Sequence, residues 1–385
     1  MRENLKAWGV ALALTLIPTL LVWAPFFLRI KEVWHVPLPT DGMATVIANF
    51  DGPLYIVVAK TFYNNLAISE LFSFPLPVEY YAAHFPLFPL LISVVGQITG
   101  FPWGMIIVTV ATATISLYFF QKLIAEYVPA RDVFWMTAVF SVFPARWLIV
   151  RSTGSPEPLF VGAILASMYF FRQKKYWRAG LWGAVAQFTK SPASLLFLAY
   201  AGYLLYPKVK ELAITNAGKW VNSLPWRAYP LNLIPLSLLG VFIVYNFTFN
   251  NFFAYFNSGD NIHLLFPPFR IFDYAQPWVG TFWLEEIIFV YLFGLMGLLR
   301  LIRKGHHELA WFVGIFFGSI LFVTHRDIMR YSLPIFPFLY VAFSDVIAHK
   351  DFKIAMAVLI IPIYLFSLAF IANNVQPISD WTPLL

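Results

Sequence analysis

The sequence predicts an all-α polytopic membrane protein, and three observations support this prediction. The chain of 385 residues is 60% hydrophobic, has a mean hydropathy of +0.72 and carries only 12% charged residues. Apolar runs recur along nearly its whole length, which is far more than one soluble core needs. Runs such as 355–372 are apolar on every face, whereas the strands of an outer-membrane barrel alternate apolar and polar residues. We therefore expect one integral membrane domain over residues 1–385.

We expect about 11 to 13 transmembrane helices, because a span needs roughly 20 apolar residues. The first comprises residues 8–28; Arg2 and Lys6 precede it and no small-residue cleavage site follows, so it is predicted to be retained with its N-terminus inside. Further spans are predicted at 86–99, 103–121, 157–171, 192–206, 229–247, 281–300, 309–323, 332–346 and 354–372.

Three additional segments are shorter than ordinary spans. Two crossings are expected between 132 and 155, with a break near Pro144, and another at 179–189. Broken or short helices inside a membrane are tolerated where they line an enclosed or water-filled cavity. These segments therefore point toward a functional site.

The distribution of basic residues predicts the orientation of the chain. The formal net charge is +7, and the densest basic clusters, 171–178, 207–212 and 300–307, lie in short links between apolar runs. Such links are expected in the cytoplasm. Residues 30–85 then form a long first external loop, and residues 249–280 form a second. The absence of Cys and the modest length favour a prokaryotic cell membrane, an archaeal one included.

The first external loop is predicted to carry an interfacial helix. On a helix, one face would carry the apolar residues Tyr55, Val58, Ala59, Phe62 and Leu66. The opposite face would carry the polar residues Lys60, Thr61, Asn64 and Asn65, which is typical of a helix lying in the membrane interface. Pro53 suits the first turn, and Asp51 lies just before it, near the N-cap. Asp41 precedes Gly42, and this pair favours a turn.

With this topology, polar residues converge on the external ends of the helices. They are Asp51, His84, Glu157, Lys190, His325, Arg326, Asp327 and Arg330. An acid at the edge of a membrane is costly unless it is paired or functional. Cations can hold a phosphate, and a carboxylate can take a proton from a hydroxyl, so the set suits glycosyl transfer from a lipid-linked anionic donor.

Four motifs in sequence resemble a known family. Phe50-Asp51 with Tyr55, the block 85–89, the block 155–160 and Thr189-Lys190-Ser191 follow the order and spacing of the mannosyltransferases that add the second mannose in glycosylphosphatidylinositol anchor assembly. A weaker similarity lies at 325–340. The sequence departs from the pattern at Pro156, at Lys190 in place of Arg, and after the acid, where Gly52-Pro53 replaces a more polar pair.

The resemblance implies a membrane glycosyltransferase of the C fold (GT-C). Such enzymes take a sugar from a polyprenyl or dolichyl phosphate on the external face and transfer it to a glycolipid or other lipid-linked acceptor. In the mannosyltransferase relatives the transfer inverts the anomeric centre without a metal or other cofactor, and an acid in the first external loop is the general base. Asp51 occupies that position.

The remaining candidates are assigned to substrate binding, each with a structural alternative. Arg326, Arg330 and Lys190 are expected to contact the donor phosphate, although Asp327 can neutralise an adjacent Arg. His84 and Tyr55 are expected beside phosphate or acceptor. Glu157 either orients the acceptor or pairs with an Arg. Asp51 itself can cap a helix, which is worth about 0.5–2 kcal/mol. Arg146 and Arg151 are second choices, because they can snorkel to an interface.

Other function classes find less support. The seven His are scattered, so no metal site is expected, and no Gly-rich phosphate loop or continuous basic patch suggests a nucleotide or nucleic acid. The main alternative is a transporter or flippase for a lipid-linked sugar or another anion, which would use the same charges for binding. It predicts inverted halves, and the sequence has no such symmetry. An acyl or phosphoalcohol transferase would favour a His motif or an acidic metal cluster.

Overall fold

The computed structural model describes residues 2–212, 217–259, 263–273, 275 and 284–385 as an all-α protein with one small hairpin. The N-terminal half contains α1 (Arg2–Phe27), β1 (Glu32–Val33), β2 (Val36–Pro37), α2 (Met43–Ile47), α3 (Gly52–Thr61), α4 (Asn65–Leu71), η1 (Val78–Ala83), α5 (Leu87–Thr99), α6 (Phe101–Ile124), α7 (Ala130–Val142), α8 (Ala145–Val150), α9 (Glu157–Arg172) and α10 (Tyr176–Thr189).

The C-terminal half continues with helices of very different lengths. They are η2 (Ser191–Ala193), α11 (Ser194–Leu212), α12 (Ala217–Ser223), η3 (Trp226–Asn232), α13 (Leu233–Phe249), η4 (Ala254–Asn257), η5 (Arg270–Phe272), α14 (Leu284–Arg303), α15 (His307–Ile320), α16 (Ile328–Ser332), η6 (Leu333–Ile335), α17 (Phe336–Ala342), α18 (Ser344–Ile347), α19 (Lys350–Asn373) and η7 (Thr382–Leu384).

Four stretches of helix in the described residues are long and apolar enough to cross a membrane. They are Glu3–Phe27, Phe101–Ile124, Trp226–Phe249 and Lys350–Asn373. Each coincides with a predicted span. The chain is therefore an integral membrane protein by the length and composition of these helices.

The other predicted spans also correspond to helices: α11 and α14 have 19 and 20 residues, and the rest are shorter or interrupted. The segment 132–155 is divided into α7 and α8 at Phe143-Pro144, and 179–189 lies within α10. The predicted span 332–346 begins within a shorter apolar helical stretch, Ile328–Ala342, and ends in α18; the stretch changes to 3-10 geometry at η6, where Pro334 lies, and a turn at Phe343 precedes α18. Residues 281–283 of another span, and 260–262, 274 and 276–280 of the second external loop, lie outside the described residues.

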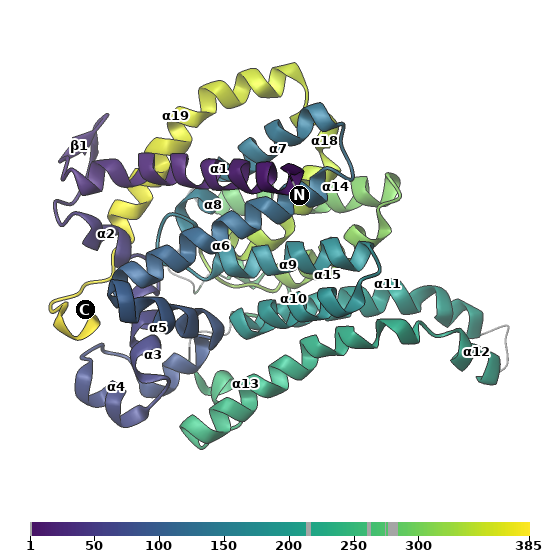
Figure 1. The fold of residues 1–385 in the computed structure, drawn as a ribbon, viewed down its shortest axis with the longest axis horizontal. Helices are drawn as coiled ribbons and strands as arrows, with labels where there is room; N and C mark the ends of the chain where they lie inside the picture. The colour runs from purple at the N-terminus through teal and green to yellow at the C-terminus, as the bar shows by residue number, and fades with distance from the viewer. Residues whose placement is uncertain (1, 213–216, 260–262, 274, 276–283) are drawn as a thin grey trace.

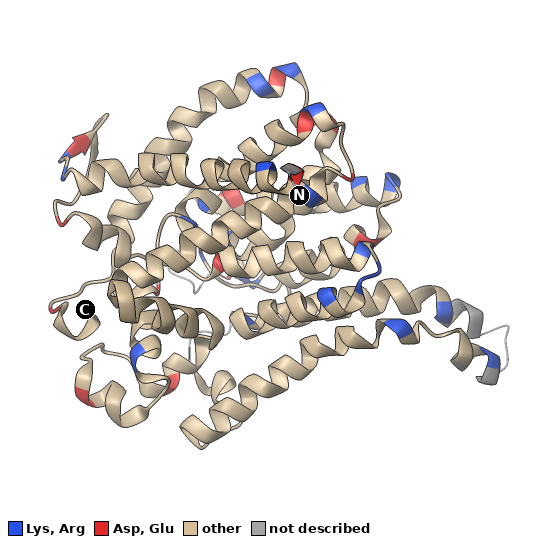
Figure 2. Cartoon of the chain, in the orientation of Figure 1, with Lys and Arg blue, Asp and Glu red and all other residues tan. Residues whose placement is uncertain are grey.

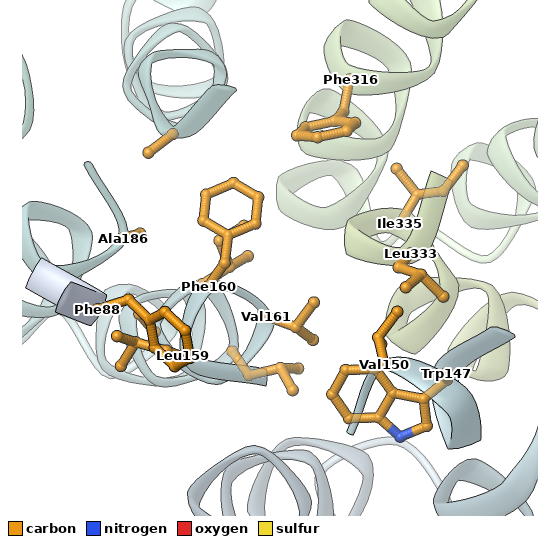
Figure 3. Packing of buried hydrophobic residues seen from close by; sticks show 14 of the residues in the cluster. Phe88, Trp147, Val150, Leu159, Phe160, Val161, Ala186, Phe316, Leu333 and Ile335 are labelled. Carbon is orange, nitrogen blue, oxygen red and sulfur yellow. The ribbon is translucent and has the colours of Figure 1, made fainter. Parts of the chain in front are cut away.

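The helices pack in layers around α6 and α9. In Figure 1, α10, α11 and α13 lie along the lower side, α1 and α6 cross the middle, and α19 arches over the top. The helix α9 packs against both α6 and α10, and α10 packs against α13. Figure 3 shows part of the buried core, where Val161 of α9, Val150 of α8 and Leu333 of η6 belong to one cluster. This core supports the segments that carry the polar residues.

Arg151 fastens the broken-helix region to the first span. Its side chain is fully buried, and its guanidinium donates to the Ser141 carbonyl (2.8 Å) and the Thr15 carbonyl (3.0 Å) of α1. A buried cation is tolerated when hydrogen bonds replace its hydration. Arg151 is thus a structural residue, and the expectation that it snorkels to an interface is wrong.

The basic links gather at one end of the bundle. Lys122, near the end of α6, binds the Asn4 side chain at the start of α1 (2.7 Å), and Arg172 pairs with Glu126 (2.6 Å) and with Glu308 (3.0 Å). Many of the Lys and Arg of these links lie toward the right of Figure 2. The opposite end of α6, roughly 35 Å away at 1.5 Å per residue, lies beside α3. Asp51 and the basic links are therefore at different ends of this helix.

The predicted interfacial helix in the first loop is partly wrong. The helix α3 ends at Thr61, because Phe62 and Tyr63 have positive φ values of 44° and 65°, and α4 starts again behind an Asn64 cap. Residues 52–59 are all buried in protein, whereas Phe62 and Leu66, from the predicted apolar face, are exposed. Lys60, Asn64 and Asn65 of the predicted polar face are exposed as expected. The correction is that the helix breaks after Thr61 and that its first eight residues are enclosed by protein.

The helix α3 packs against α5 and α6, which are themselves closely packed on each other. An added Cβ at Gly104 would lie 2.8 Å from the Gly96 backbone. We expect Gly104→Ala to destabilise the protein by about 1–3 kcal/mol, because the two backbones must separate. Thermal unfolding in detergent measures this, with Gly318→Ala as the matched control, since a Cβ there meets nothing within 4 Å. An equal melting temperature for the two variants would contradict the packing.

Candidate active site

The carboxylate of Asp51 is available for chemistry because it does not cap α3. Asp51 occupies the N-cap position, with Pro53 in the first turn, but its side chain accepts no hydrogen bond from the helix. Phe50, immediately before it, has a φ of 50°, which turns the chain sharply into the helix. The capping alternative is therefore excluded in this conformation. The side chain instead lines a cavity.

The cavity has a volume of about 860 Å³ and collects most of the predicted site residues. Asp51 and Tyr55 of the first loop, His84, Lys190, Arg326 and Arg330 all line it. These six come from segments spread over 280 residues of sequence and meet around one space. Glu157 is the exception, since it is buried and does not line the cavity.

Glu157 lies behind the cavity wall and holds two cations in place. One oxygen, Oε1, accepts from Lys190 Nζ and from Arg330 Nε, both at 2.7 Å. The other oxygen accepts from the Ser155 hydroxyl. A carboxylate with all these partners has little capacity left for a substrate. We therefore revise its role from orienting the acceptor to positioning Lys190 and Arg330.

Arg330 connects the buried carboxylate of Glu157 to the partly exposed carboxylate of Asp51. Its Nε binds Glu157, whereas its Nη2 lies 3.7 Å from Asp51 Oδ2. The guanidinium also lies over the Phe50 ring, 4.7 Å from the centroid. The contact with Asp51 is the looser of the two, so the outer edge of Arg330 is the part that an incoming anion can approach.

Arg326 and Arg330, four residues apart, would share one face only if the link between them were helical, and it is not, because α16 starts at Ile328. Arg326 precedes the helix and is exposed. Asp327 does not neutralise it but pairs with Arg146, whose Nε lies 3.0 Å from Asp327 Oδ1 and whose guanidinium stacks 3.7 Å from the Phe370 ring. Among the described residues, Arg326 has no carboxylate within 4 Å. It supplies the uncompensated positive charge of the cavity.

Arg146 is a cavity residue, although the sequence placed it only as a second choice. It is 8% exposed and lines the cavity beside Asp327 and Phe370, so it does not snorkel to an interface. Its Nη1 is buried and has no hydrogen-bond partner among the described residues. The Arg146–Asp327 pair makes this part of the wall polar but electrically neutral.

Two histidines in the cavity wall are held in the neutral form. Burial lowers the pKa of His84, whose ring meets Tyr55 edge-on at 4.7 Å. Burial together with the neighbouring His263 lowers the pKa of His325 to about 3, and its Nδ1 accepts from the Asp327 amide. Neutral imidazoles can exchange hydrogen bonds with hydroxyl groups but add no charge for an anion.

Another part of the cavity is apolar. Three helices contribute its side chains, with Leu195 from α11, Leu238 and Phe242 from α13, and Phe316 and Ile320 from α15. The charged residues and this apolar wall belong to one continuous space. An elongated amphipathic molecule matches such a surface.

Sequence reasoning missed several lining residues. The most distinctive are the amides after the last span, Asn373, Asn374 and Gln376, and Tyr255, whose hydroxyl lies 2.7 Å from that of Ser191 in the Thr189-Lys190-Ser191 motif. A signal for the amides was present, since the polar run 373–376 ends an apolar span on the same side as Asp51. Among the described residues, no group of three or more His, Asp or Glu side chains could hold a metal ion.

Comparison with known proteins adds no identification. No model of a known protein family matches the chain, and no curated protein matches it either. The function must therefore be argued from the geometry of the cavity.

The buried ion pairs predict a coupled loss of stability. Glu157→Gln leaves Lys190 and Arg330 without their shared carboxylate, and breaking a buried pair in this way costs about 3–5 kcal/mol. We expect the additional change Lys190→Gln to restore part of that loss, because one unpaired cation is then removed. Thermal unfolding of the two single variants and the double variant measures the coupling. Strictly additive effects would show that Glu157 does not hold Lys190.

Proposed function

We propose that this protein is a glycosyltransferase that takes a sugar, a mannose or another hexose, from a polyprenyl or dolichyl phosphate. The acceptor is a glycolipid or another lipid-linked molecule, and Asp51 is the general base. The observation that carries the proposal is an uncapped carboxylate lining the same cavity as Lys190, Arg326 and Arg330. A base and a phosphate-binding group in one space are what glycosyl transfer from a lipid phosphate needs.

The proposed reaction is one inverting displacement. The acceptor hydroxyl oxygen attacks the anomeric carbon, and Asp51 takes its proton. The bond between the anomeric carbon and the phosphate oxygen breaks, and its electron pair leaves with the polyprenyl phosphate. One carboxylate suffices, because no covalent sugar–enzyme intermediate forms. We propose that the reaction needs no metal ion, since cationic side chains can stabilise the departing phosphate.

The charges of the cavity favour Arg326 as the principal phosphate contact. Lys190 and Arg330 share the carboxylates of Glu157 and Asp51, and Arg146 is paired with Asp327. Arg326 is exposed and has no carboxylate within 4 Å among the described residues. Arg330 can add a contact through its outer edge. This is consistent with an anionic donor headgroup bound close to Asp51.

The apolar wall supports the lipid part of the proposal. An isoprenoid chain can lie against Leu238 and Phe242 of α13 and Phe316 of α15, while its phosphate reaches the cations. The four long apolar helices are consistent with the C fold of membrane glycosyltransferases. We propose that shorter helices complete a set of about 11 to 13, as hydrophobic patterning suggests.

The decisive experiment is transfer by purified protein from polyprenyl-phosphate mannose to a lipid acceptor in vesicles. We expect Asp51→Asn to lower the rate by about 100-fold or more, because the amide cannot accept the proton. Asp41→Asn is the matched control: Asp41 lies in the same loop, is exposed and does not line the cavity. Unchanged transfer by Asp51→Asn would remove Asp51 as the base. Movement of the intact donor across the vesicle without bond cleavage would favour a flippase.

A second experiment tests whether the cavity opens on the external face. The chain contains no Cys, so single cysteines can be introduced without background. We expect an impermeant maleimide to label Lys31→Cys in intact cells and Lys174→Cys only after permeabilisation, because the two exposed positions lie at opposite ends of the bundle. Labelling in the reverse pattern would put Asp51 in the cytoplasm and exclude an external reaction.

A further inference from the structure

The segment after α19 forms an amide-rich part of the cavity wall. Asn373, Asn374 and Gln376 line the same space as Asp51, and we refer to these three residues as the amide wall. They lie more than 320 residues from Asp51 in sequence, and the motifs that suggested the function do not include them. Their chemistry differs from that of the cations, since amides carry no charge.

Main-chain pairing fixes the amide wall beside the proposed base. Asn49 and Val375 form an antiparallel bridge, and the main-chain N–H of Gln376 donates to the Ala48 carbonyl at 2.7 Å. The Asn49 side chain adds a bond from its Nδ2 to the Ile371 carbonyl at 2.9 Å. The bridge joins a residue two positions before Asp51 to the residue directly after Asn374, and Phe50, Asp51, Asn373 and Asn374 all line the cavity.

The amide wall retains hydrogen-bonding capacity. Asn374 donates to Asn49 Oδ1 at 3.2 Å, and Asn373 donates to the Ala369 carbonyl at 2.8 Å. The structure gives the Gln376 side chain no hydrogen bond to any described residue, because its only bond uses the main chain. Each free amide offers both a donor and an acceptor.

The electrostatics near the amide wall favour a neutral ligand. Arg146 is paired with Asp327 and stacked on Phe370, one helical turn before Asn374. Arg330, over the Phe50 ring, is paired with Glu157 and Asp51. The unpaired charge belongs to Arg326, on a different segment. A neutral molecule with several hydroxyl groups matches paired charges and free amides better than a second anion does.

We propose that the amide wall is the acceptor subsite, which binds the hydroxyl groups of a neutral sugar headgroup and presents one of them to Asp51. This inference rests on the proposed glycosyl transfer and extends it, because it assigns the acceptor class and the residues that select it. The donor phosphate lies at Arg326, and the acceptor approaches from the end of α19.

The test measures acceptor and donor kinetics separately. Wild type and Gln376→Leu are compared in phosphatidylcholine nanodiscs, with short-chain polyprenyl-phosphate mannose as donor and octyl mannoside as acceptor probe. Leucine preserves the side-chain volume and the main-chain bond to Ala48. We expect the KM for octyl mannoside to rise about three- to tenfold, as the loss of a hydrogen bond predicts, while the KM for the donor stays within about twofold.

Gln97→Leu is the matched control, because Gln97 is exposed on α5 and does not line the cavity. We expect it to leave both KM values unchanged, and equal melting temperatures exclude misfolding of either variant. An unchanged acceptor KM in Gln376→Leu, or a rise in the donor KM instead, overturns the inference and leaves the transferase proposal intact.

A binding measurement separates the two proposals if no transfer occurs. Saturation-transfer NMR with mannobiose reports contact between sugar hydroxyls and the protein without any reaction. Saturable binding that weakens in Gln376→Leu would support the amide wall even if the transferase proposal fails. Absence of saturable binding to the wild type, together with absence of transfer, would overturn both.

Discussion

The buried carboxylate of Glu157 is the group on which the organisation of the cavity depends. It draws Lys190 from the end of α10 and Arg330 from α16 onto one oxygen, and these segments are 140 residues apart in sequence. Removing a charge of this kind from water is costly unless its partners are close and well oriented. The carboxylate in turn fixes the side chains of Lys190 and Arg330, so their charges reach the cavity in defined positions. A buried structural ion pair thus sets the geometry of a polar surface.

A second constraint acts on the base side of the cavity. Pro53 and the turn at Phe50 start α3 directly after Asp51, and enclosure of residues 52–59 by protein prevents this start from shifting. The strand-like pairing of 48–49 with 375–376 holds the other flank. Asp51 is therefore positioned by main-chain contacts on both sides, while its carboxylate remains free of capping bonds.

The cavity combines three surfaces with different chemistry. Lys190, Arg326 and Arg330 line it together with Asp51, an apolar wall comes from α11, α13 and α15, and amides come from the end of α19. A lipid phosphate requires the first two, and a neutral hydroxylated molecule suits the third. The arrangement is therefore consistent with two substrates that meet at one carboxylate, although neither comparison with known proteins identifies a relative.

The sequence alone determined the class of the protein, because so many hydrophobic residues cannot be buried in a soluble core. It also located most helices and five residues that line the cavity, namely Asp51, His84, Lys190, Arg326 and Arg330. Only the tertiary structure decided what each of them contacts. Periodicity is the same whether a helix faces lipid, water or protein, so the burial of α3 was not predictable. Asp327 pairs with Arg146 and not with the adjacent Arg326, and Glu157 is buried behind the cavity wall. Both facts depend on distances between helices that are far apart in the sequence, which no local sequence pattern contains.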